Sequence, residues 1–266
     1  MKIISIFFVL LSIGIQLHSA GNGISSCIYS KSERRVTFEC SGYVDERLFY
    51  PSFNHFCGDQ VALNAFNKDE IKAIAFQNCE LHELPREMFE EYNKVQVLNI
   101  SNLGLKWLYL EEARSVIKIF ASHNQLKMIP EQLGRIEQID LSHNEIDEIK
   151  SKVNSSSCNR VTMLDLSFNN INEVNVDTFN LFCELQHLNL SYNRIKEIQP
   201  GTFSQLTKLK TLDLSNNYIQ FSYNDIHLQN TVQLTVTIAK GNQQQRSKEL
   251  NKSNHSRLRI DNIEKN

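Results

Sequence analysis

The 266-residue sequence is poor in the two residues that most often interrupt folded structure, with nine glycines and four prolines. This scarcity argues against long disordered linkers over most of the chain. A large excess of one charge is also lacking, because 28 basic and 30 acidic residues give a formal net charge of −2. A net charge this small produces only a weak electrostatic field, which argues against nucleic acid or an anionic membrane as the main partner.

Long apolar runs are scarce as well. The run Ile3–Ile15 is shorter than the roughly 20 residues that a membrane-spanning helix needs. Lys2 precedes it and small residues follow at 19–21, an order typical of a secretory signal, which we predict over residues 1–20. Removing the signal leaves 27 basic and 30 acidic residues, a net charge near −3. We therefore expect a secreted, extracellular chain without a membrane span.

An internal repeat is the main pattern in the rest of the sequence. The segments VTMLDLSFNNI (161–171), LQHLNLSYNRI (185–195) and LKTLDLSNNYI (209–219) have apolar residues at positions 1, 4, 6 and 11 and asparagine at position 9. The frame also starts at Val116 and Ile136, in weaker form at Ile71 and Val95, and in degenerate form at Leu234. Successive starts are 20 to 25 residues apart, which is the period of leucine-rich repeats.

The repeat predicts an α/β repeat fold, a leucine-rich-repeat solenoid or horseshoe with a parallel β-sheet on its concave face. Positions 4 and 6 alternate with polar neighbours, so each repeat should give a short strand whose inward side chains stack on the next repeat. The position-9 asparagines should bond backbone groups left unpaired by the turn; they are Asn124, Asn144, Asn169, Asn193 and Asn217. Three phenylalanines share position 19 and should pack on the convex side: Phe89, Phe179 and Phe203.

The expected organisation has five parts. They are a signal peptide (1–20), a cysteine-containing N-terminal cap (21–70), about seven repeats (71–220), a degenerate last repeat (221–240) and a polar, disordered tail (241–266). The tail has no cysteine and no heptad series.

Six cysteines follow the signal, at Cys27, Cys40, Cys57, Cys79, Cys158 and Cys183. An even number in an exported chain predicts disulfides, and the lack of a CxxC pair argues against a zinc or thioredoxin-like site. We expect CIYSKSERRVTFEC (27–40) to form a hairpin stapled by Cys27–Cys40, and Cys57–Cys79 to tie the cap to the first repeat. Cys158 and Cys183 precede adjacent repeats, so their pairing would join consecutive coils. Six cysteines allow fifteen pairings, so the connectivity remains a prediction.

Residues arranged for chemistry are not evident in the sequence. His123 and His143 share position 8, but His187 is at position 3 and no further metal ligands accompany them. The DLS tripeptides of three repeats have no arranged histidine for a nucleophilic triad, and no glycine-rich phosphate loop occurs. We therefore expect no enzyme activity, no metal and no cofactor.

The outward strand positions of repeats three to six form the candidate protein-binding surface. They hold Lys118, Phe120, His123, Gln138, Asp140, His143, Met163, Asp165, Phe168, His187 and Tyr192. Exposed apolar side chains among charges resemble an interface core with a polar rim, and we expect the contact to centre on Phe120, Met163 and Phe168. Scattered exposed apolar residues are also ordinary on protein surfaces.

Five N-glycosylation sequons occur, at Asn99, Asn154, Asn189, Asn251 and Asn254. Asn99 and Asn189 are at position 5, on the expected concave face. Glycans on these two residues would screen part of that face and move binding toward repeats three to five or the flanks.

These features resemble the secreted leucine-rich immune proteins of mosquitoes over roughly residues 1–220. The resemblance rests on the signal, CIYSKSERRVTFEC, IKAIAFQNCELHELPREMF, the regular repeats, and the Cys158 and Cys183 pair flanking VTMLDLSFNNINEVN. Other insect extracellular repeat proteins, including Toll-type ectodomains, share the same repeat pattern.

The resemblance implies a haemolymph factor that supports a complement-like thioester protein against parasites or bacteria, with extracellular proteins or a pathogen surface as partners. The alternatives are an extracellular adhesion, matrix or developmental protein and a soluble Toll-like decoy. Long family members continue into a cysteine-rich segment and a coiled coil that mediate pairing. This sequence lacks both segments, so the resemblance predicts no oligomeric state for it. The chain is a short family member, a truncated gene model or a variant with another last exon.

Overall fold

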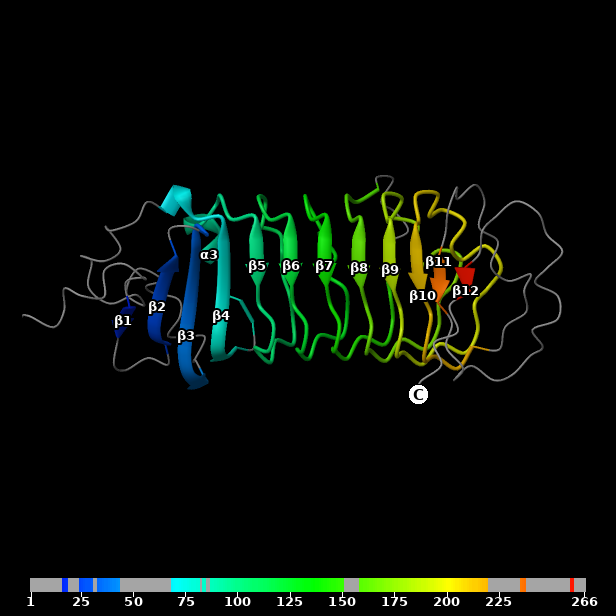
Figure 1. Ribbon diagram of the computed structural model, residues 1–266, viewed down its shortest axis with the longest axis horizontal. Helices are drawn as coiled ribbons and strands as arrows, with labels where there is room; N and C mark the ends of the chain where they lie inside the picture. Colours follow the sequence, from blue (N-terminus) through cyan, green and yellow to red (C-terminus); the bar gives the residue numbers. More distant parts are fainter. Residues whose placement is uncertain are drawn as a thin grey trace, which may run out of the picture. The chain divides into compact units, whose positions relative to one another are not determined.

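The computed structural model describes residues 16–18, 24–30, 33–43, 68–81, 83–84, 87–150, 158–219, 235–237 and 259–260. The chain forms two compact units, the N-terminal unit (residues 1–124) and the C-terminal unit (residues 125–266). Both consist of the short, sequentially ordered strands of a leucine-rich-repeat solenoid (Figure 1).

The N-terminal unit begins with antiparallel strands and continues with parallel ones. Its strands are β1 (Gln16–His18), β2 (Ile24–Ser30), β3 (Arg35–Tyr43), β4 (Ala73–Glu80), β5 (Val97–Asn99) and β6 (Lys118–Phe120). The antiparallel pairing of β2 with β3 confirms the predicted hairpin, and β3 to β6 pair in parallel. A 3-10 helix, η1 (Lys68–Glu70), and a short helix, α3 (Glu87–Glu91), lie between strands. Cleavage near residue 20 would remove β1, because β1 lies within the predicted signal.

The C-terminal unit contains parallel strands in sequence order. They are β7 (Gln138–Asp140), β8 (Met163–Asp165), β9 (His187–Asn189), β10 (Thr211–Asp213), β11 (Thr235–Thr237) and β12 (Arg259–Ile260). Each pairs with the next in parallel register. β11 begins one residue after the start of the degenerate repeat, and β12 lies within the segment expected to be a polar tail. The domain boundaries themselves stay predictions.

Leucine stacking explains why such short strands persist. Leu164 on β8 is in register with Leu188 on β9, and both are 2 % exposed. The leucines at position 6, Leu166 and Leu190, are fully buried. One coil could not enclose these side chains alone, so burial of apolar surface depends on stacking of successive coils.

The asparagine at position 9 closes the turn after the strand in the five regular coils, as predicted. The Asn169 amide nitrogen donates to the carbonyl oxygens of Leu166 (3.1 Å) and Leu141 (2.9 Å), and its oxygen accepts from the Ile146 amide (3.0 Å). The same pattern recurs at Asn193. These buried amides satisfy backbone groups that would otherwise be left without bonds in an apolar interior.

Aromatic side chains fill the space behind the strands. Phe179 and Phe203 stack with ring centroids 5.7 Å apart in the C-terminal unit, and Phe89 is buried in the N-terminal unit. This confirms that the position-19 phenylalanines serve packing. In the N-terminal unit, Phe38 of β3 stacks on Phe76 of β4 with centroids 5.2 Å apart, so the cap shares an aromatic core with the first repeat.

The disulfide of the cap differs from the prediction. Cys40 pairs with Cys79 instead of Cys27, so both Cys27–Cys40 and Cys57–Cys79 are wrong; Cys57 itself lies outside the described residues. The cause is register: Cys27 lies opposite Phe38, while the parallel pairing of β3 with β4 brings Cys40 to a Cα–Cα distance of 4.7 Å from Cys79. The staple therefore joins the cap to the first repeat instead of closing the hairpin.

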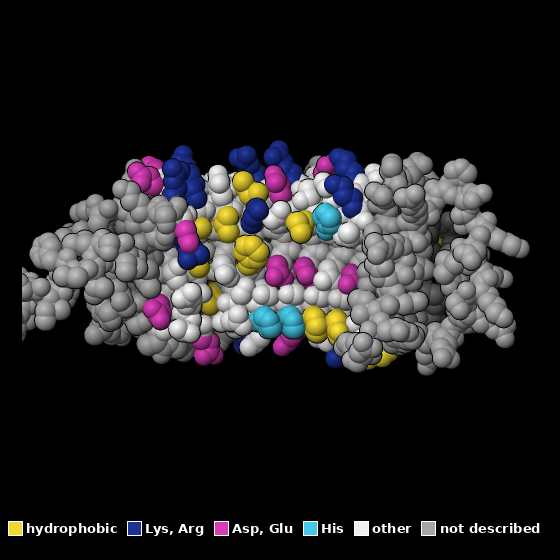
Figure 2. Space-filling view, viewed as in Figure 1, with side chains coloured by type: hydrophobic (Ala, Val, Ile, Leu, Met, Phe, Trp, Pro, Cys, Tyr) yellow, Lys and Arg dark blue, Asp and Glu magenta, His cyan; other side chains and the backbone are white. Residues whose placement is uncertain are grey.

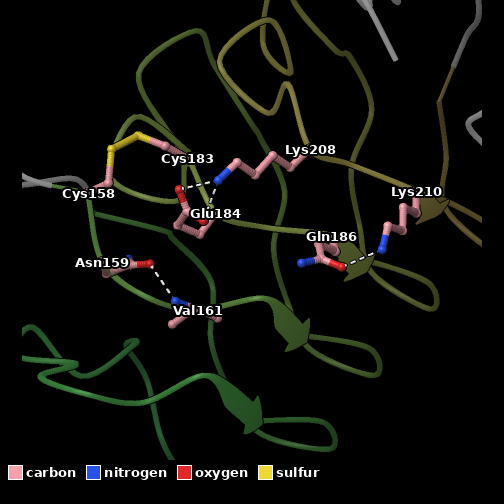
Figure 3. Close-up of polar contacts among 8 residues, drawn as sticks. All are labelled: Cys158, Asn159, Val161, Cys183, Glu184, Gln186, Lys208 and Lys210. Carbon is pink, nitrogen blue, oxygen red and sulfur yellow. Dashed lines mark hydrogen bonds and ion pairs between the residues drawn. A yellow bond between two sulfur atoms is a disulfide. The ribbon is translucent and has the colours of Figure 1, made fainter. Parts of the chain in front are cut away.

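The second disulfide, Cys158–Cys183, confirms the prediction for adjacent coils, with a Cα–Cα distance of 5.6 Å. Figure 3 shows polar contacts between coils near it: Glu184 bonds to Lys208 (2.6 Å), and Gln186 accepts from Lys210 (2.6 Å). Glu184 and Lys208 are about half exposed, at 43 % and 52 %, so their ion pair adds little stability in water.

Candidate protein-binding face

Position 8 of the repeat has a fixed and unusual backbone. In the C-terminal unit φ is 53° at His143, 54° at Phe168 and 53° at Tyr192. The amides of these residues donate to the position-7 carbonyl oxygens of the following coil, Phe168 to Ser191 at 3.1 Å for example. This bond and the buried asparagine at position 9 hold the backbone in the left-handed region. The side chain at position 8 is therefore directed by the fold.

Three rings at this position stack on consecutive coils. The ring centroids of His143 and Phe168 are 4.1 Å apart with planes 10° from parallel, and those of Phe168 and Tyr192 are 4.1 Å apart at 9°. Phe168 and Tyr192 remain 41 % and 39 % exposed. We call these three residues the ring ridge. In Figure 2, histidine and hydrophobic side chains follow one another in a row at the lower edge of the described surface.

A second row consists of the position-5 side chains on neighbouring strands. Register places Asp140 beside Asp165, Asp165 beside Asn189, and Asn189 beside Asp213. Each accepts the amide of the residue two positions on, at 2.8 to 3.0 Å, and so caps the turn. The amide nitrogen of Asn189 also donates to Asp165 (3.1 Å). We call Asp140, Asp165 and Asp213 the aspartate row; its members are half-buried and combine a structural role with negative charge.

Position 3 gives a third, mixed row. Gln138, Met163, His187 and Thr211 are in register across β7 to β10. Met163 is 43 % exposed, and a hydrogen bond of 2.8 Å joins His187 Nδ1 to Thr211 Oγ1. This pairing ties the one histidine of the row to its neighbouring strand. No group of three metal-ligating side chains occurs within the described part of the chain.

The remaining predicted residues belong to the N-terminal unit. Lys118 and Phe120 are on β6, Phe120 is 41 % exposed, and His123 follows with φ of 56°. Register places Phe120 directly opposite Asn99. A glycan on Asn99 would therefore lie beside Phe120, because the two residues occupy the same position on adjacent strands.

The structure thus groups eight predicted residues on the C-terminal unit: Gln138, Asp140, His143, Met163, Asp165, Phe168, His187 and Tyr192. Two further members, Asp213 and Thr211 of β10, were missed. The segment LKTLDLSNNYI has aspartate at position 5, as two earlier repeats do, so the repeat alignment could have identified Asp213. The predicted set ended one repeat too early.

Of the predicted sequons, two lie among the described residues. Asn99 is exposed, whereas Asn189 is half-buried. Asn154, Asn251 and Asn254 lie outside the described residues. No helix in the described ranges is long and apolar enough to cross a membrane.

Comparison with known proteins agrees with this architecture. A leucine-rich-repeat family model matches residues 159–219. The fold resembles the leucine-rich-repeat domain of APL1, a mosquito immune protein, at 18 % identity and a TM-score of 0.53 over 84 % of this chain and 52 % of that one. It also resembles human 5T4, a trophoblast glycoprotein also called Wnt-activated inhibitory factor 1, at 15 % identity and a TM-score of 0.57 over 84 % and 83 %.

A third similar structure is TLR13 in complex with ssRNA13, at 22 % identity and a TM-score of 0.51 over 65 % of this chain and 26 % of that one. Identities this low establish likeness of fold alone. The chain spans about half the length of the APL1 domain that it matches. A search of curated protein sequences finds no match.

Proposed function

We propose that this chain is a secreted leucine-rich-repeat binding protein, not an enzyme, and that the ring ridge of its C-terminal unit makes the principal protein contact. The observation that carries the proposal is the stack of His143, Phe168 and Tyr192 on three consecutive coils. Exposed aromatic side chains on a rigid scaffold are typical of the residues that dominate binding free energy.

The fold itself does not require rings at position 8. Asparagine tolerates a left-handed backbone better than phenylalanine or tyrosine does. Other coils use it there: φ is 54° at Asn78, 59° at Asn102 and 54° at Asn216. The rings of the ridge are therefore not explained by backbone geometry, which supports a role in contact with a partner.

The test is the affinity of the Phe168→Asn variant for a partner captured from haemolymph. Asn216 shows that asparagine fits this backbone, so the variant should fold. Loss of a central aromatic anchor should weaken binding by at least about 2 kcal/mol, or roughly thirtyfold. Tyr218→Ala is the matched control, because Tyr218 is exposed at 65 % but lies at position 10, outside the ridge.

Wild-type affinity in Phe168→Asn would overturn the ring ridge as the principal contact. If Met163→Ala and Phe120→Ala were also without effect, the whole concave face would be excluded. The N-terminal cap and the convex flank would then become the candidate contacts.

The biological role that we propose is that of an innate-immune recognition or adaptor factor, with a complement-like thioester protein as the partner to test first. Its support is the resemblance of residues 1–220 to secreted immune proteins of mosquitoes, together with the likeness of fold to the APL1 domain. Induction of the transcript in blood cells or fat body after infection is the expected result. Constitutive embryonic or neural expression would contradict the immune role and favour adhesion or matrix assembly.

A further inference from the structure

We propose that the ring ridge and the aspartate row together take one kind of ligand, a basic and partly apolar segment of a partner protein. This inference rests on the proposed function, because it assigns the partner's chemistry at the same face. Its elements are the charge of the face, the orientation of the rings and the row of small side chains between them.

The charge of the face has one sign. Positions 3 to 8 of four consecutive coils are QIDLSH, MLDLSF, HLNLSY and TLDLSN, with three aspartates and no lysine or arginine. Asp140 and Asp165 are in direct register on adjacent strands, which lie about 4.8 Å apart in a sheet. The two carboxylates therefore repel each other in the unbound protein, and a cation bound between them would relieve this repulsion.

The ring ridge suits a different part of the ligand from the aspartate row. Because the rings are within 10° of parallel at 4.1 Å, the faces of Phe168 are covered by His143 and Tyr192, which leaves ring edges exposed. Ring edges carry partial positive charge, so a cation is not expected to bind over Phe168 at the centre of the ridge. The edges instead suit apolar side chains, or the hydrocarbon stem of an arginine or lysine.

Serines at position 7 lie between the two rows in the sequence. Ser142, Ser167, Ser191 and Ser215 are at most 9 % exposed, and the Ser167 hydroxyl donates to Asp165 (2.6 Å). In Figure 2, the acidic side chains form a row parallel to the histidine and hydrophobic row, with white atoms between them. A segment laid along this band could direct apolar side chains toward the ridge and basic ones toward the aspartates.

The test uses the full secreted chain and a soluble synthetic peptide in which arginines and leucines are spaced by serines. Binding is followed by fluorescence anisotropy of the labelled peptide and by the aromatic NMR signals of Phe168 and Tyr192. We expect saturable binding that weakens as ionic strength rises, with shifts of both ring signals. A version with glutamine in place of arginine, and one with glutamate, should bind far more weakly.

The decisive variant is Asp140→Asn/Asp213→Asn. Each substitution turns an Asp-Leu-Ser tripeptide into an Asn-Leu-Ser sequon, so the variant and the wild type are both produced without N-glycosylation. Asn189 occupies the same position on β9 and caps its turn through its own side chain, accepting the Ser191 amide at 3.0 Å, so asparagine should keep the fold. The variant also leaves the Asn189–Asp165 bond in place. Loss of two half-buried charge pairs should weaken peptide binding about fivefold at low salt. Glu173→Gln/Glu197→Gln removes the same charge from exposed position-13 residues and should leave binding unchanged.

Equal binding of the glutamine or glutamate peptide, or wild-type affinity of Asp140→Asn/Asp213→Asn, would overturn the basic segment. The proposed function has a separate outcome: if Phe168→Asn still loses the haemolymph partner, the ridge remains the contact and only its ligand chemistry is wrong.

Discussion

Position 8 of the repeat has the same left-handed backbone in both units but carries different side chains. In the N-terminal unit it holds Asn78, Asn102 and His123, with φ between 54° and 59°. In the C-terminal unit it holds the three stacked rings, and Asn216 then follows at φ of 54°. The repeat thus fixes the backbone angle φ at position 8, whereas it does not fix which side chain occupies that position. A difference at this position therefore reports on function more directly than a difference in the core.

Position 9 shows the opposite behaviour. The C-terminal unit keeps a buried asparagine in every regular coil, while the first two coils of the N-terminal unit replace it with Cys79 and Leu103. Cys79 is bonded to Cys40, and the Leu103 amide donates to Asn124 (3.1 Å). Near the cap, a disulfide and an apolar side chain take the place of the asparagine ladder.

Removing the disulfides is expected to have the largest effect on stability. Cys40→Ala/Cys79→Ala opens a bridge across 39 residues, and Cys158→Ala/Cys183→Ala opens one across 25. Chain-entropy estimates give losses of roughly 4 and 3.5 kcal/mol in the free energy of unfolding. Urea denaturation measures both, and non-reducing peptide mapping checks connectivity. Recovery of a Cys27–Cys40 peptide from the wild type would contradict the structure.

The next largest effect should come from the ladder itself. Asn169→Ala removes one acceptor and three carbonyl contacts in a buried turn, which should cost about 3 kcal/mol in the free energy of unfolding. Asn172→Ala is the control, because Asn172 is exposed three residues later and should change stability by less than about 0.5 kcal/mol. Similar losses from both variants would mean that the buried amide contributes no more than a surface residue.

At position 8 the expected effect is smaller and should be equal in the two units. Asn102→Ala should lower the free energy of unfolding by about 1 kcal/mol, since alanine tolerates a φ near 59° less well. The same difference should separate Phe168→Ala from Phe168→Asn, because both lose the stack but only asparagine suits the backbone. Thermal and urea unfolding of the four proteins supply the comparison. If Phe168→Ala were the more stable of its pair, backbone preference would not explain the asparagines.

The smallest effect is expected at position 5, where the two units differ in exposure of a sequon. Asn99 is exposed, whereas the Asn189 amide nitrogen donates to Asp165 and the hydroxyl of Ser191, itself buried, donates to Asn189 (2.8 Å). We therefore expect a glycan on Asn99 and none on Asn189. Asn99→Asp should increase gel mobility and change stability by less than about 0.5 kcal/mol, and Asn189→Asp should leave gel mobility unchanged. A mobility shift from Asn189→Asp would place sugar on the proposed face.

The repeat itself was readable from sequence because its signal is redundant. Five full copies fix the strand, the buried leucines and the asparagine turn independently of one another, so an error in one copy does not move the others. This redundancy explains why burial of Leu164, the bonds of Asn169 and the pairing of Cys158 with Cys183 all follow the prediction.

The cap offered no such redundancy. Cys27 and Cys40 are close in sequence, which favours a local bridge, but antiparallel register decides which side chains meet, and that register depends on turn geometry. Likewise, the alignment indicated that Phe168 faces outward but not that it stacks on both neighbours. Stacking depends on rotamers and on the spacing of coils, and neither can be read from residue types.

The turn cap at position 5 accepts either aspartate or asparagine, since Asp165 and Asn189 bond the backbone alike. Codons for these two amino acids differ by a single base. Each coil can therefore gain or lose a negative charge by one nucleotide change, with the turn bond retained. Among diverging copies of such a gene, the charge of the proposed binding face can change while the turn bond is kept. Partner preference would then evolve faster than the scaffold.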